Sequence, residues 1–245
     1  MRKKTTRMSQ RTRGGNTVDL HTLASLMHID RNHGADATGN EKAVSEPCKI
    51  AFVAANSRST SQIELGEECR ESQHELKLTR YRSDFLFESR WAVTIDELIR
   101  FLNELNPTVI HFAGHAGACG LILQDDRGQP DPISPRALAM IIRAAAPRAR
   151  LVVINACDGL KHANAVRAEV DAVVAMAGQI TDDGARMFVA RLYGALGNRK
   201  SVANAVAQGV ARLAAAGLVD ELVPRCLTRD GIDADRLVLS GPRSR

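Results

Sequence analysis

Two stretches of this sequence decide its fold: Val109-Ile110-His111-Phe112-Ala113-Gly114-His115-Ala116-Gly117 and Leu151-Val152-Val153-Ile154-Asn155-Ala156-Cys157-Asp158-Gly159. Each is an apolar, β-branched run that ends in a small, turn-forming segment with one reactive residue. A parallel sheet buries both faces of its strands, so such strands read as continuous hydrophobic runs. Open α/β sheets bind ligands beyond the carboxyl ends of these strands. The two stretches therefore predict a cysteine–histidine dyad at that edge, formed by His115 and Cys157.

The composition allows one large α/β domain and disfavours nucleic acid as a partner. The chain has 245 residues, 44% of them hydrophobic, and a net charge of +5. Residues 1–47 hold eight Lys and Arg against five Asp and Glu, which leaves the rest of the chain near neutral. Aromatic residues make up only 4%, whereas nucleic-acid proteins combine a basic stripe with aromatic side chains that stack on bases. We therefore expect no nucleic-acid partner.

The cysteines and the apolar runs predict a cytoplasmic protein. The five cysteines are widely spaced and form no CxxC, so neither a zinc site nor a disulfide framework is expected. No apolar run approaches the roughly 20 residues that span a bilayer, and the basic start is followed by no apolar stretch of the signal-peptide type. The acidic pairs lack EF-hand spacing. We expect no metal, no organic cofactor and no membrane span.

The sequence divides at about residue 48. Residues 1–47 are rich in Arg, Thr, Ser, Asn and Gly, and we interpret them as a basic, mostly disordered arm. Within this arm, 18–29 is a candidate amphipathic helix, and a role in adaptor docking or inhibition is an alternative interpretation. Residues 48–245 form one predicted domain.

Alternating patterns after residue 48 predict an α/β/α sandwich, in which helices cover both faces of a mostly parallel sheet. Thr94 and Glu97 have the spacing of a capping box, and Asn106-Pro107 ends the helix that they begin. The segment 125–128 is a predicted hairpin turn. The predicted strands are 49–55, 84–91, 108–112, 120–124, 150–155, 172–176 and 222–227, and the predicted helices are 64–78, 94–105, 134–146, 182–196 and 201–215.

These motifs together resemble the CHAT domain, a branch of the caspase-like, separase-related cysteine peptidases. The resemblance covers roughly residues 49–241 and implies a caspase-like cysteine endopeptidase, a regulated bacterial effector that cuts a specific protein partner. Its expected partners are a protein substrate and an activating or adaptor protein. Besides the two stretches quoted above, the resemblance rests on 51–56 (AFVAAN), 67–71 (EECRE), 176–185 (MAGQITDDGA), Phe188 and 193–196 (YGAL).

The resemblance also implies roles for the site residues. A free thiol with a pKa near 8.5 is largely protonated at neutral pH, so the Cys157 nucleophile needs His115 as its base. By resemblance, the N–H groups of Cys157 and of the turn Gly114–Ala116 would bind the oxyanion. The family commonly has His-Gly where this chain has His115-Ala116. Because alanine tolerates positive φ poorly, a turn that relied on it here would be strained.

An acidic residue in the S1 pocket would favour a basic P1 side chain through a charge-assisted pair. Asp158, directly after the nucleophile, is one candidate for this role, and Asp182 is another. The alternative for Asp158 is a hydrogen bond within its own turn.

The remaining reactive residues are interpreted as structural. His111 lies inside a strand, where a satisfied packing histidine is the ordinary outcome, and His162 is expected to begin a helix and to be solvated. Asp125-Asp126 is interpreted as a turn and Asp182-Asp183 as a helix cap. The four cysteines without a histidine-bearing turn are expected to be packing or surface thiols: Cys48, Cys69, Cys226 and Cys119, the last a candidate for the cleft rim.

Three classes of function remain. The first is the cysteine endopeptidase described above. The second is a CHAT-like interaction module of weak or lost activity, for which Ala116 would mark the loss. The third is an α/β domain that binds a small ligand or nucleotide, which the absence of G-x-G-x-x-G and G-x-x-x-x-G-K-[ST] motifs weakens.

Overall fold

The computed structural model of the protein describes residues 46–55, 63–114, 116–117, 120–156, 159–178, 181–218 and 224–241. Three predicted site residues, His115, Cys157 and Asp158, lie outside these ranges, as does Cys119. Almost all of the predicted arm, with its candidate helix 18–29, also lies outside them. The boundary at residue 48 therefore stays a prediction.

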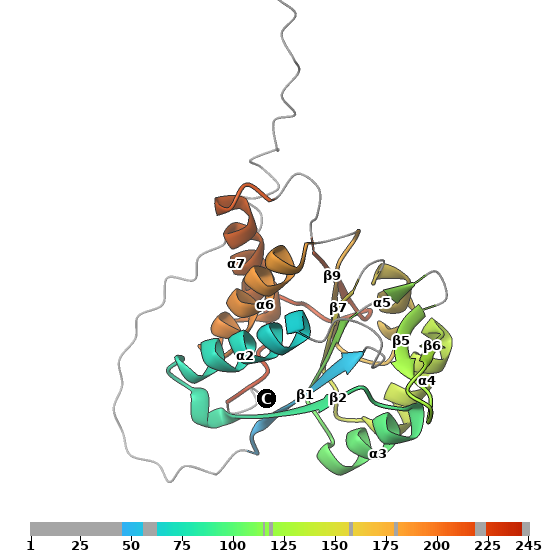
Figure 1. Ribbon diagram of the computed structural model, residues 1–245. Coiled ribbons are helices and arrows are strands. Elements are labelled where there is room, and N and C mark those ends of the chain that lie inside the picture. Colours follow the sequence, from blue (N-terminus) through green and yellow to red (C-terminus); the bar gives the residue numbers. More distant parts are fainter. Residues whose placement is uncertain are drawn as a thin grey trace, which may run out of the picture. The chain divides into compact units, whose positions relative to one another are not determined.

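Strands and helices alternate through the described residues (Figure 1). The predicted elements are present with small shifts at their ends, although the first two residues of predicted strand 222–227 lie outside the described ranges. The strands are β1 Cys48–Ala55, β2 Phe85–Trp91, β3 Val109–Gly114, β4 Ala116–Gly117, β5 Gly120–Gln124, β6 Pro130–Ile133, β7 Leu151–Asn155, β8 Ala172–Ala175 and β9 Arg225–Thr228. The helices are α2 Ile63–Lys77, α3 Ile95–Leu105, α4 Pro135–Ala145, α5 Leu160–Val166, α6 Asp182–Leu196 and α7 Val202–Ala215. A 3-10 turn, η1, lies at Arg82–Asp84. The strand β4 and the turn η1 were not predicted, and β6 and α5 were implied only by the predicted hairpin and by the helix expected at His162.

A six-stranded sheet in the order β2-β1-β3-β7-β8-β9 forms the centre of the domain. The first five strands are parallel, and only β9 runs antiparallel to its neighbour β8. Because β2 lies on one side of β1 and β3 on the other, the order of connection reverses between β1 and β3. Such a reversal is where open α/β sheets form their binding crevice. A second sheet, β4-β5-β6, is the predicted hairpin with β4 added.

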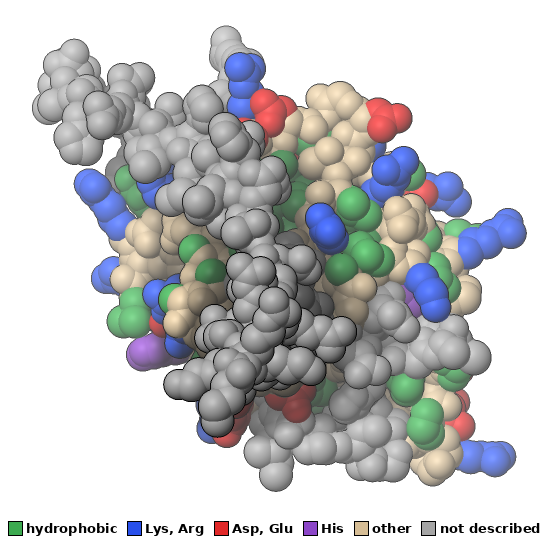
Figure 2. Space-filling model, turned by 90° about the horizontal axis from the view of Figure 1, so that it is seen from above, with side chains coloured by type: hydrophobic (Ala, Val, Ile, Leu, Met, Phe, Trp, Pro, Cys, Tyr) green, Lys and Arg blue, Asp and Glu red, His purple; other side chains and the backbone are tan. Residues whose placement is uncertain are grey.

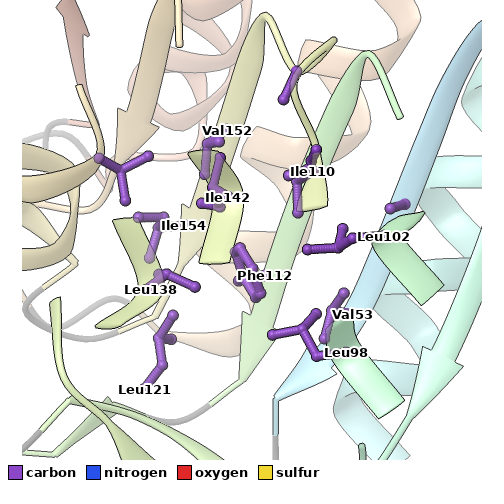
Figure 3. Close-up of a cluster of buried hydrophobic side chains, with 14 of the residues drawn as sticks. Val53, Leu98, Leu102, Ile110, Phe112, Leu121, Leu138, Ile142, Val152 and Ile154 are labelled. Carbon is purple, nitrogen blue, oxygen red and sulfur yellow. The ribbon is translucent and has the colours of Figure 1, made fainter. Parts of the chain in front are cut away.

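Helices cover both faces of the large sheet, which confirms the predicted sandwich. On one face, α3, α4 and α5 pack against side chains such as Val152 and Ile154 of β7, and Figure 3 shows this core with Leu121 of β5 inside it. On the other face, α6 and α7 pack against Leu151 and Val153, and Figure 1 shows α2 on the same side. Alternate residues of β7 thus enter different cores, which is why the strand reads as an unbroken apolar run.

Helix starts follow the predicted capping chemistry, with one correction. The capping box of α3 is complete: Thr94 Oγ1 accepts from the N–H of Glu97, and the Glu97 carboxylate accepts from the N–H of Thr94. The pair Asp182-Asp183 is not the cap of α6, because Thr181 accepts from the N–H of Gly184 and takes that place. The two aspartates lie in the first turn, where the helix dipole favours negative charge.

Gly114 allows β3 to end close against β1. Its φ is +148°, and an added Cβ would lie 2.0 Å from the carbonyl oxygen of Ala55. Both the conformation and the contact require a residue without a side chain. The glycine therefore fixes the backbone one residue before His115.

Gly114→Ala should destabilise the domain by at least about 1–3 kcal/mol, because it strains the backbone and clashes with β1. Gly66→Ala is the matched control, since Gly66 lies inside α2 with no atom within 4 Å of an added Cβ. The control should stabilise by about 0.5–1 kcal/mol. Denaturant unfolding measures both, and equal effects of the two variants would contradict this role of Gly114.

Candidate active site

The ends of β3 and β7 carry the two halves of the candidate site. The strands pair in parallel and in one register, from Val109 opposite Leu151 to Ala113 opposite Asn155. Partners in this register are 42 residues apart in the sequence. His115 and Cys157 each follow the last register pair by two residues and are separated by the same 42 residues. The structure thus brings together the two strand ends from which the candidate dyad continues.

Ala116 does not lie in a strained turn, which was expected if residue 116 needed a positive φ. In the described part of 109–117, the positive φ lies at Gly114, whereas Ala116 forms β4 and pairs with Leu121 of β5. A strand position has negative φ, which alanine adopts without strain. The contribution of the backbone N–H groups of Gly114 and Ala116 to an oxyanion site stays a prediction.

The chain after β7 is tightly held on both sides of residues 157–158. Ala156 is buried, and its carbonyl accepts from the N–H of Gly159 at 3.2 Å. An added Cβ on Gly159 would lie 3.1 Å from the Ile154 carbonyl oxygen and 3.2 Å from that of Ala156. A larger residue at 159 would have to displace the backbone that flanks the candidate nucleophile.

Asn155 is a polar residue of this region to which sequence reasoning assigned no role. Its side chain is buried at the end of β7, and neither its amide oxygen nor its amide nitrogen has a hydrogen-bond partner among the described residues. Leaving such a group unpaired costs about 1–3 kcal/mol. Buried polar groups are nearly always paired, and an unpaired one calls for an explanation such as strain or a catalytic role. The available signal was a lone polar residue at the end of an apolar run, directly before the candidate site.

Of the two candidate S1 residues, the structure describes Asp182. It is exposed in the first turn of α6, the helix that follows β8. Because β8 runs parallel to β7, α6 begins on the edge of the sheet at which β3 and β7 end. The adjacent Asp183 is held by an ion pair with Arg186, whereas no hydrogen bond or ion pair of Asp182 occurs among the described contacts. A role of Asp182 in substrate selection stays a prediction.

His111 is a packing histidine, as predicted. It is fully buried, with Nε2 3.0 Å from the Glu68 carboxylate of α2 and Nδ1 3.1 Å from the Tyr193 hydroxyl of α6. Burial, together with Glu68, raises the pKa of Tyr193 well above its usual value. These three side chains connect β3 to the helices α2 and α6.

His162 is buried, and the prediction that it is solvated was wrong. Only 2% of its surface is exposed, and its Nε2 accepts a hydrogen bond from the N–H of Leu121 at 3.1 Å. The same nitrogen lies 3.3 Å from the carbonyl oxygen of Ile133. The hairpin covers this face of α5, and a seven-residue helix is too short for its apolar face to be read from periodicity.

The three described cysteines are packing thiols, as predicted. Cys48 and Cys69 are buried and Cys226 is half-buried. Burial raises the pKa of Cys48 to about 12 and that of Cys226 to about 11, and it also raises the pKa of Cys69. Because the thiolate is the nucleophilic form, burial disfavours the reactive state of these cysteines at neutral pH. Asp125 is likewise a turn residue as predicted, accepting from the N–H groups of Arg127 and Gln129.

Lys and Arg side chains are spread over the molecular face in Figure 2, interspersed with hydrophobic and acidic side chains. They form no continuous basic stripe among the described residues of this face.

Within the described ranges, every helix is too short or too polar to cross a membrane.

The family and the fold are established by comparison with known proteins. The family model of the CHAT domain matches residues 18–218, more than half of the sequence and beginning within the predicted arm, so the chain belongs to the CHAT domain family. Caspase-1 from Spodoptera frugiperda has a similar structure, with a TM-score of 0.52 and 13% identity over 82% of this chain and 92% of that one. The domain therefore has a caspase-like fold.

Two further proteins are similar to this chain. A Gillisia limnaea protein named "Probable protease" is 27% identical over 125 residues, which are 50% of this chain and 22% of that protein. This chain thus matches about a fifth of the length of that relative. A secreted C11 cysteine protease from Bacteroides thetaiotaomicron, solved with an irreversible peptide inhibitor, aligns with a TM-score of 0.47 and 10% identity over 61% of this chain and 56% of that one.

Proposed function

We propose that this protein is a caspase-like cysteine endopeptidase that cuts a protein partner through His115 and Cys157. The observation that carries the proposal is the register of β3 and β7, whose 42-residue offset equals the separation of the two residues. Neighbouring strands lie about 4.7–4.9 Å apart. The pairing ends at Ala113 and Asn155, and His115 and Cys157 each follow two residues later, so both would start from neighbouring points at one edge of the sheet. From there the imidazole can come within hydrogen-bond reach of the thiol, as an activated cysteine requires.

In the proposed reaction, His115 takes the proton of the Cys157 thiol. The thiolate then attacks the carbonyl carbon of the scissile peptide bond, and a C–S bond forms. Collapse of the tetrahedral intermediate breaks the C–N bond while His115 gives its proton to the leaving amine. Water, deprotonated by His115, then attacks the thioester carbonyl carbon. A C–O bond forms, the C–S bond breaks, and the departing thiolate takes the proton back from His115 as the acid product leaves. Backbone N–H groups of Cys157 and of the segment Gly114–Ala116 are the proposed oxyanion donors.

The position of Ala116 in β4 supports activity over the alternative of an inactive interaction platform. A loss of peptidase activity was expected only if residue 116 needed a positive φ, which alanine adopts poorly. A strand position does not require a positive φ. We further propose, from family usage, that the protein is a regulated effector of the bacterial cytoplasm. An activating or adaptor protein would then release its activity toward a specific protein substrate.

Cleavage of a diverse peptide library by the wild-type protein should fall by at least about 10³-fold in both Cys157→Ala and His115→Ala, because each removes half of the dyad. Cys226→Ala is the matched control, since burial holds this thiol protonated, and it should keep the wild-type rate. Turnover that persists in Cys157→Ala would contradict the proposal.

A latent enzyme can be distinguished from a scaffold if no peptide is cut. An electrophilic, thiol-directed peptide probe should then label Cys157 faster than the buried cysteines, and His115→Ala should abolish the preference. Labelling of Cys157 no faster than that of the other thiols would contradict a catalytic dyad.

We also propose that Asp158 or Asp182 lies in the S1 pocket and favours Lys or Arg at P1. Replacing the relevant aspartate by Asn should lower the ratio of kcat/KM for Arg over Leu at P1 by about tenfold, since a hydrogen bond to a charged group contributes about 1.5–3 kcal/mol. Asp183→Asn is the control for Asp182→Asn, because Arg186 already holds the Asp183 carboxylate. Wild-type cleavage after Leu as fast as after Arg would contradict this selectivity.

A further inference from the structure

The two segments that follow the candidate dyad in the sequence contact each other at His162. The hairpin β5–β6 follows His115 in the chain, and the helix α5 follows Cys157. The imidazole of His162 projects from α5 into the contact between them, where Leu121 and Ile133 are also buried. Among the described residues, the polar contacts between α5 and this hairpin all involve Nε2 of His162, which accepts from the N–H of Leu121 and lies 3.3 Å from the Ile133 carbonyl oxygen.

The geometry favours one protonation state of the ring. Two contacts compete for Nε2: a ring with its proton on Nδ1 accepts from the N–H of Leu121 at 3.1 Å, whereas a ring with its proton on Nε2 would donate to the Ile133 carbonyl at 3.3 Å. The Leu121 contact is the shorter of the two, and we therefore assign the proton to Nδ1. Burial lowers the pKa of His162, as does the neighbouring Lys161, while the Ile133 carbonyl opposes them. The neutral ring that can accept from Leu121 is therefore the form favoured at neutral pH.

The hydrogen bond from the Leu121 N–H to the ring leaves Nδ1 buried without a partner among the described residues, a free-energy cost that an apolar side chain would avoid. Around the ring, Ala163 and Val166 of α5 pack into the core with Leu121 and Ile133 as apolar side chains do. A leucine at 162 would suit these surroundings chemically but would leave the Leu121 N–H without its acceptor.

We infer that His162 is a positioning residue for the dyad, which holds the segment after His115 and the helix after Cys157 at a fixed separation. This inference rests on the proposed function. His162 acts through the hairpin and the helix and touches no substrate. Removing its acceptor nitrogen loosens the link, and His115 and Cys157 then meet less often in the geometry that forms the thiolate.

The test measures how fast iodoacetamide alkylates Cys157 as a function of pH, resolved from the other four cysteines by peptide mass spectrometry. In His162→Leu, the pH profile should move toward that of a free thiol, with alkylation at pH 6 slower by about tenfold, the effect of one pKa unit. Hydrogen exchange of the Leu121 amide should accelerate in the same variant.

Two further variants separate positioning from general destabilisation. In His162→Gln, the side-chain oxygen can accept from the Leu121 N–H, and alkylation at pH 6 should return to within about threefold of wild type. Val166→Ala removes buried apolar atoms from the same helix and keeps His162. This control should lower the melting temperature without moving the alkylation profile.

The outcomes distinguish the inference from the function on which it rests. If His115→Ala shifts the profile but folded His162→Leu does not, the dyad exists and the positioning role of His162 is wrong. An equal shift in Val166→Ala would also overturn that role, because any loosening of α5 would then suffice. If His115→Ala leaves the wild-type profile unchanged, there is no dyad, and the proposed function fails together with the inference.

Discussion

The parallel hydrogen bonding of β3 with β7 is the interaction on which the rest of the structure depends. A slip of one residue would move every side chain of β7 to the opposite face of the sheet. Because residues such as Val152 and Val153 are packed in different cores, neither face would tolerate the exchange. The register is therefore firmly set. It places Ala113 opposite Asn155, so the segments that follow these two residues start from neighbouring points.

Neighbouring features secure these two strand ends. Gly114 lets β3 end against Ala55 of β1, beside the reversal of strand order. Gly159 lets the chain after β7 close on Ala156, and His162 ties the following helix to the hairpin. The buried amide of Asn155, without a partner among the described residues, is a polar group held at the same edge. By contrast, the described cysteines are deep or partly buried thiols whose raised pKa values keep them protonated.

Sequence patterns predicted the elements whose determinants are local. The apolar runs of β3 and β7, the Thr94–Glu97 capping box and the turn at Asp125 each depend on residues close together in the chain. Three features were missed or misjudged because they depend on distant partners or weak local signals. His162 is buried by hairpin residues 29 and 41 positions away, Glu68 contacts His111 only through the packing of α2, and Thr181 caps α6 in place of the aspartates beside it.

The central claim is that His115 and Cys157 lie side by side at the ends of β3 and β7, and a disulfide trap tests it most directly. Disulfides require Cα atoms about 4.4–6.8 Å apart, which matches the spacing of adjacent strands. In His115→Cys, mild oxidation of the folded protein should join residues 115 and 157, whereas Arg127→Cys, on the exposed hairpin turn, should not pair with Cys157. Separate alkylation of both thiols in oxidised, folded His115→Cys would contradict the account.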